Sequence, residues 1–118
     1  MTHLSPAARD AVQAAARAVL GRCGPAWRID PRVPTRATRA ALDTGATYAD
    51  IATAMKEIRD AEGPDAIRAA AVATVRYGII GAPIHPKWEE AMNTAYALGA
   101  TADEIATEAR RVRLEAAR

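Results

Sequence analysis

The stretch that decides the fold is GATYADIAT at residues 45–53, and it recurs as GATADEIAT at residues 99–107. Seven of the nine positions are identical or exchange only Asp for Glu, at a constant offset of 54 residues. The same offset pairs Ala37 with Ala91 and Ala41 with Ala95. Each copy follows a proline-containing loop, and each loop follows an alanine-rich stretch. An ordered repeat of this kind indicates two copies of one structural unit.

The repeated motif predicts the turn of a helical hairpin. Its glycine accepts the left-handed backbone conformation that ends a helix. Its threonine caps the next helix, and the acid three residues later accepts a hydrogen bond from the backbone N–H of the cap. An apolar stripe with 3-4-3 spacing follows, which is typical of the packing face of a helix. The stripe consists of Tyr48, Ile51, Met55 and Ile58 in the first copy, and of Ala102, Ile105, Ala109 and Val112 in the second.

The motif and the segments on either side of it predict an all-α protein with six helices. Ser5-Pro6 begins the first helix, Gly63-Pro64 ends the third, and no segment alternates with the period of two that a strand requires. The expected helices lie at about 5–20, 35–44, 48–62, 65–79, 87–98 and 102–116. They form a single helical domain, residues 1–118, built from two tandem three-helix repeats, residues 5–62 and 63–118. An approximate internal two-fold relates the repeats.

The composition predicts the size of the core, the need for a partner and the cellular compartment of this domain. The chain has 31 alanines and no phenylalanine among 118 residues, so the core is small and a homodimer or another partner is expected. Cys23 is the single cysteine, which fits a reducing compartment. No apolar run has the length of a signal or membrane-spanning segment, so we expect a cytoplasmic protein with no membrane partner. The wealth of alanine and arginine is typical of GC-rich bacterial or phage genomes.

Residues that carry chemistry are sparse. The histidines are His3 and His85, which do not make a metal site, and Cys23 has no histidine near it in the sequence. The chain has one serine, Ser5, and no glycine pattern that binds nucleotide phosphates. Adjacent carboxylates fall in first helical turns, where the helix dipole explains them. We therefore expect no catalytic residue, no metal, no cofactor and no enzymatic activity.

Charge is organised in blocks although the net charge is only +2. Residues 1–40 carry +5 and residues 41–66 carry −4; residues 67–88 carry +3, residues 89–109 carry −5 and residues 110–118 carry +3. Two interpretations stay open: basic faces dock on acidic helices within the protein or between subunits, or a basic face binds nucleic acid phosphates. The candidate nucleic-acid-binding residues are Arg28, Arg32, Arg36, Arg39, Arg110, Arg111 and Arg113.

The pattern A-x3-G-A-T-x2-(D/E)-I-A resembles the opening of a bacterial helix-turn-helix over about 15 residues per copy, and this resemblance implies DNA binding. The sequence departs from it where the tight turn requires a glycine, because Lys56 and Arg110 stand there. Residues 88–112 are also similar to the carboxymuconolactone decarboxylase and alkylhydroperoxidase helical proteins. That family's Cys-x-x-Cys pair is replaced by Ala82-Pro83-Ile84-His85, which excludes its peroxidase chemistry here.

The function we expect is that of a small bacterial or phage nucleic-acid-binding or regulatory protein, acting as a dimer through its arginine-rich surface. The alternative is a non-enzymatic protein–protein interaction module, such as an adaptor, inhibitor or antitoxin-like protein, that uses its acidic helices with Trp27 and Trp88 as the partner surface. A third hypothesis is a small-molecule-binding helical protein. The first requires a contiguous arginine face, the second an exposed apolar patch beside the tryptophans, and the third an enclosed apolar pocket.

Overall fold

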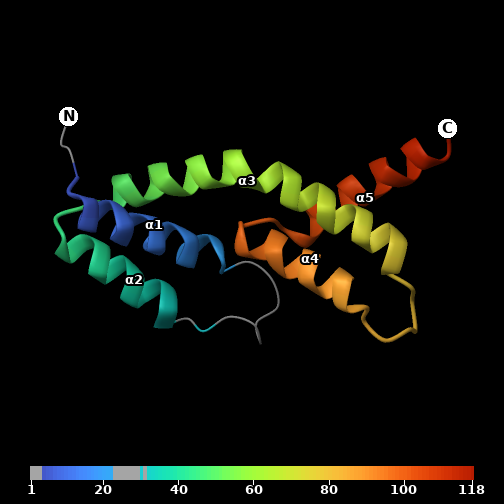
Figure 1. The fold of residues 1–118 in the computed structure, drawn as a ribbon, viewed down its shortest axis with the longest axis horizontal. Coiled ribbons are helices and arrows are strands. Elements are labelled where there is room, and N and C mark those ends of the chain that lie inside the picture. The colour runs from blue at the N-terminus through green and yellow to red at the C-terminus, as the bar shows by residue number, and fades with distance from the viewer. Residues whose placement is uncertain (1–3, 23–29, 31) are drawn as a thin grey trace.

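The computed structural model of the chain describes residues 4–22, 30 and 32–118, and it shows five helices in that part (Figure 1). They are α1 (Pro6–Leu20), α2 (Arg32–Asp43), α3 (Tyr48–Tyr77), α4 (Pro86–Ala97) and α5 (Ala102–Ala116). Within the described ranges no strand occurs, so the all-α fold class is confirmed. The molecule is elongated, with extents of 51 × 30 × 19 Å.

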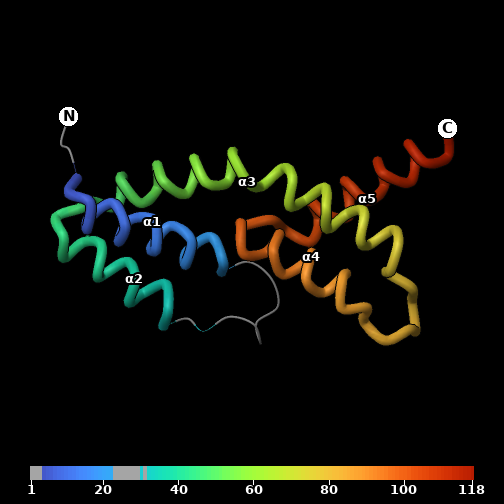
Figure 2. Tube along the Cα trace, in the orientation of Figure 1, coloured from blue at the N-terminus to red at the C-terminus, as the bar shows by residue number. Residues whose placement is uncertain are grey.

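The helices are arranged along α3, which runs through most of the long axis. Helix α1 packs against α2 and against the first part of α3, whereas the second part of α3 packs against α4 and α5. Helix α1 also contacts α4, which joins the two groups. The beginning of α1 and the end of α5 lie at opposite ends of the long axis (Figure 2).

The expectation of six helices in two separate three-helix repeats is wrong, because residues 48–62 and 65–79 belong largely to one helix. Gly63 is buried inside α3, and Pro64 lies within the helix. Proline has no N–H to donate to the carbonyl of residue 60 and commonly kinks a helix, and the path of α3 bends near its middle (Figure 2). Packing of the buried Ile58 and Ala66 on either side keeps the helix continuous. We therefore speak of an N-terminal half, residues 5–62, and a C-terminal half, residues 63–118, that share α3.

The repeated motif forms the same turn in both halves, as predicted. Gly45 and Gly99 have φ angles of 92° and 83°. The Asp50 N–H donates to Thr47 Oγ1 at 3.2 Å, and the Thr47 N–H donates to Asp50 Oδ2 at 2.8 Å. Thr101 and Glu104 make the same reciprocal pair, with distances of 3.2 and 3.1 Å. Helices α3 and α5 therefore both begin at a complete capping box.

The core consists mainly of alanines with a few larger side chains. Ala15, Ala41, Ala70, Ala95 and Ala100 are fully buried and allow the helices to approach closely. Isoleucines and leucines fill the remaining space, namely Leu20, Ile51, Ile58, Leu98 and Ile105.

The expected apolar stripe is confirmed in part, because Ala102 is exposed and Val112 is only half-buried. Ile51, Ile58, Ile105 and Ala109 are buried, and Met55 packs against the core. The expectation for Tyr48 is wrong, because its side chain is 70% exposed. Tyr48 is the first residue of α3, one residue after the cap, where the helix has not yet reached its packing partner.

Ion pairs link the helices across both halves. Arg17 on α1 binds Glu62 on α3 at 2.8 Å, and Arg68 on α3 binds Glu108 and Glu115 on α5 at 2.9 and 2.6 Å. Hydrogen bonds from these arginines lower the pKa of Glu62 and of Glu115. Basic segments do therefore dock on acidic helices within the molecule, and this accounts for part of the charge pattern.

Candidate nucleic-acid interface

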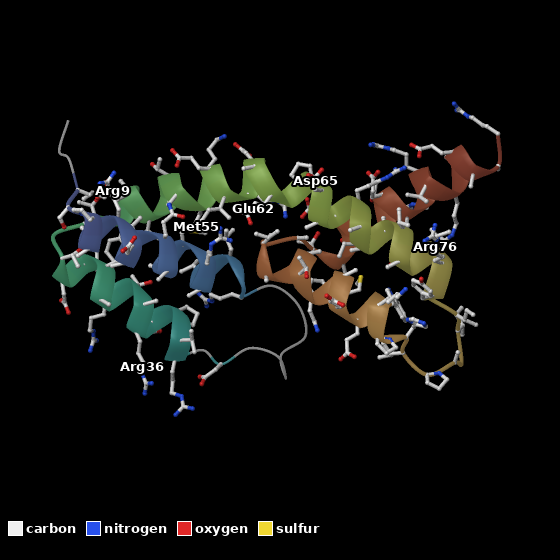
Figure 3. The ribbon with its side chains drawn as sticks, viewed as in Figure 1. Arg9, Arg36, Met55, Glu62, Asp65 and Arg76 are labelled. Carbon is white, nitrogen blue, oxygen red and sulfur yellow. The ribbon has the colours of Figure 1, made fainter. Side chains whose placement is uncertain are left out.

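Helix α2 presents three arginines on its outer face. Arg32, Arg36 and Arg39 are spaced by four and three residues, which places them on one side of a helix, and all three are exposed. The opposite side carries the buried Pro34 and Ala41. In Figure 3, Arg36 projects from α2 away from the body of the protein. The amphipathic pattern of α2 thus fixes where the arginines point.

The three arginines differ in their ion pairing. Arg32 binds Asp30 at 3.1 Å, and this hydrogen bond lowers the pKa of the Asp30 carboxyl. Among the described residues, Arg36 and Arg39 make no salt bridge. The charge of Arg36 still acts on Asp30 and adds to the lowering of the pKa of its carboxyl, but in the described part neither guanidinium is held in a salt bridge that an external anion would have to displace.

A hollow of about 340 Å³ adjoins this face, between the end of α1 and α2. Arg22 and Arg39 line it together with the hydroxyl-bearing Thr35 and Thr38. Asp43 also lines it and offsets part of the positive charge. The sequence analysis missed Arg22, since the residue lies just beyond α1 and only the fold brings it beside α2. We call Arg22, Arg32, Arg36 and Arg39 the basic edge.

The structure does not bring the other candidate arginines to the basic edge. Arg110, Arg111 and Arg113 lie on α5, at the end of the molecule opposite the α2–α3 connection (Figure 1). Arg111 binds Glu108 at 3.4 Å, and Arg110 donates to Thr107 Oγ1 at 3.3 Å. Arg28 lies outside the described residues. The seven arginines therefore do not form one surface.

Of the two tryptophans, Trp27 lies outside the described residues and Trp88 serves the fold. The Trp88 Nε1–H donates to Thr74 Oγ1 at 3.0 Å, and the Thr74 hydroxyl donates to the Ala70 carbonyl at 2.8 Å. Trp88 is half-buried and holds α4 against α3. The apolar residues exposed near it are Ile79, Ile80 and Ile84, in the loop between α3 and α4.

A second hollow is an open groove of about 750 Å³ between α3 and α5. Charged side chains dominate its lining, and Arg59 pairs there with Glu104 across the two helices. This groove is not the enclosed apolar pocket that a small-molecule binder requires. No group of three or more His, Cys, Asp or Glu side chains in the described ranges is placed to hold a metal ion. None of the described helices has the length and apolar character needed to cross a membrane.

Helix continuity also bears on the helix-turn-helix resemblance. Helix α3 passes through Lys56 without interruption, and α5 passes through Arg110. The tight turn before a recognition helix is therefore absent from both copies, as the sequence indicated.

Comparison with known proteins adds no relative: no family model, no curated protein and no solved structure matches this chain.

Proposed function

We propose that the protein binds nucleic acid through the basic edge and acts as a small regulatory protein of a bacterium or phage. The observation that carries this proposal is the pair Arg36 and Arg39, exposed on the outer face of α2 and without a salt bridge among the described residues. Arginine is the residue best suited to phosphate, because its planar guanidinium donates two parallel hydrogen bonds.

The arginines that the fold uses make a clear contrast with this pair. Arg17, Arg59 and Arg68 each bind a carboxylate on a neighbouring helix. Arg36 and Arg39 make no such link, so removing them leaves the helix packing intact. Exposed arginines without a structural role are the ones available for a ligand.

The basic edge favours a duplex backbone over single strands. The hollow beside it is lined by two arginines and two threonines, side chains that contact phosphate oxygens, together with Asp43 and several apolar residues. Single-strand binders add aromatic side chains on which bases stack, and Tyr48 is the one aromatic residue lining the hollow in the described part. We expect affinity for duplex DNA with weak sequence preference. Two associated copies in the cytoplasm would present two such edges to one duplex and raise the avidity.

The test is fluorescence anisotropy of a labelled duplex titrated with protein. We expect Arg36→Ala with Arg39→Ala to weaken binding by about tenfold or more and to reduce the slope of log affinity against log salt by about two. The matched control is Arg9→Ala with Arg76→Ala, which removes two exposed arginines elsewhere (Figure 3).

The two double variants have the same net charge, so they separate a site from general attraction. We expect the control to retain affinity within about threefold, because distant exposed charges are screened at physiological salt. Equal losses in both variants would show that only net charge matters, and unchanged affinity in Arg36→Ala/Arg39→Ala would refute the proposal.

One observation favours the alternative function of a protein-interaction module. Ile79, Ile80 and Ile84 are exposed in the loop that precedes α4, and exposed apolar residues close together can mark interaction sites. The acidic helices support this alternative less, because Glu104 and Glu108 are already bound to arginines of α3. If duplex DNA does not bind, the isoleucine loop becomes the first surface to test.

A further inference from the structure

The two halves of the molecule meet at a defined interface. The Leu20 side chain at the end of α1 lies over the α4–α5 turn, with its Cδ2 3.0 Å from the position that a Cβ on Gly99 would occupy. Arg59 on α3 donates to the Leu98 carbonyl at 3.3 Å and pairs with Glu104, the acid of the capping box. The N-terminal half thus covers the turn of the C-terminal half with one apolar and one basic residue.

The equivalent turn of the N-terminal half is uncovered. Gly45, which corresponds to Gly99, has no neighbouring atom within 4 Å of the position of a Cβ. Thr44, which corresponds to the buried Leu98, is exposed. Asp50 corresponds to Glu104, and its salt bridge to a covering arginine has no counterpart among the described ion pairs.

The C-terminal half carries counterparts of Leu20 and Arg59, and these counterparts do not cover a turn in the described part of the molecule. Leu20 is the last residue of α1 and is followed by Gly21. By its place at a helix end, and at an offset of 57 residues rather than 54, it corresponds to Tyr77, the last residue of α3, which is followed by Gly78. The exposed Ile79 and Ile80 come directly after it. Arg113 on α5 corresponds to Arg59 at the offset of 54 residues, is exposed and makes no ion pair among the described side chains.

The α2–α3 turn lies at one end of the long axis, and the ends of α3 and α5 lie at the other (Figure 1). We propose that the chain associates head to tail with a second copy of itself, in which the α3 end and Arg113 of one copy cover the α2–α3 turn and Asp50 of the next. The interface between copies repeats the interface between the two halves. Because the two surfaces differ, the contact is heterologous and can add further copies.

The test uses sedimentation velocity from about 1 µM to about 1 mM, the range in which weak protein associations form. Wild-type protein is expected to exceed the mass of a dimer as its concentration rises. Ile79→Asp with Ile80→Asp removes one surface, and Thr44→Arg blocks the other with a like charge opposite Arg113. Each variant alone is expected to remain the 12.5 kDa monomer. The control Val33→Asp changes an exposed apolar residue of α2 outside both surfaces and should associate like wild type.

Mixing the two blocked variants gives the decisive result. Each retains one intact surface, so the mixture should form a dimer and no larger species, which also shows that both variants are folded. A wild-type chain that stays monomeric, blocked variants that still associate, or a mixture that stays monomeric would each overturn the proposal. A dimer that does not grow with concentration would overturn it too, because a symmetric contact stops at two copies.

Discussion

Helices α2 and α4 hold the same place in the two halves and differ in what they show to solvent. Ala41 and Ala95, at equivalent positions, are both fully buried. On the outer faces, Arg36 of α2 corresponds to Glu90 of α4, and both are exposed. The packed alanine is kept in both copies, whereas the exposed residue changes sign. The helix packing is therefore compatible with either sign of charge at this outer position.

The two turns make a second comparison, between identical local structures in different surroundings. Both have a glycine with positive φ and a complete capping box. The α4–α5 turn is covered by Leu20 and Arg59, and the α2–α3 turn is open. Local sequence sets the conformation of each turn, and only the neighbouring half sets its exposure.

The largest loss of stability is expected in the core, at a pair of equivalent isoleucines where the two halves are most alike. Ile51 and Ile105 are equivalent and are buried to nearly the same degree. Truncation to alanine should lower the free energy of unfolding by about 2–4 kcal/mol at either position, because each leaves a cavity in the core. Urea denaturation followed by circular dichroism measures both losses. A loss below about 1 kcal/mol at one position would show that the cores of the two halves are not equivalent.

A smaller and unequal effect is expected at the two turn glycines. Gly45→Ala should cost about 1 kcal/mol, because alanine is strained at positive φ. Gly99→Ala carries the same strain and also pushes the new methyl group against Leu20, so its loss should be about twice as large. The midpoints of thermal unfolding compare the two variants directly. Equal midpoints would mean that Leu20 moves aside for the new methyl group without a loss of stability.

Much of this structure follows from local sequence. The Thr47 and Thr101 caps, the glycine turns and the all-helical class depend on interactions within a few residues, so the repeat predicts them. Gly63-Pro64 shows where that reasoning fails: these residues end most helices, yet packing on both sides carries α3 through them. A sequence without its partners in space cannot show that compensation.

The candidate site was also predicted only in part from the sequence. The spacing of Arg36 and Arg39 places them on one side of a helix, and the structure leaves that side exposed. Which other arginines lie on this surface depends on the fold. The fold adds Arg22 to the basic edge and leaves the α5 arginines far from it. Long-range geometry of this kind is not encoded in spacing along the chain.

The most direct test of the central claim exchanges one charge between α2 and α4. Arg36→Glu with Glu90→Arg moves an arginine to the equivalent position of the other half and keeps the net charge at +2. The measurement is the affinity for a labelled duplex by fluorescence anisotropy, at about 50 and 200 mM salt. The basic edge on α2 predicts a clear loss of affinity and a shallower salt dependence in the exchange variant. Affinity equal to that of the wild type would contradict the account, since it would show that the position of the arginine does not matter.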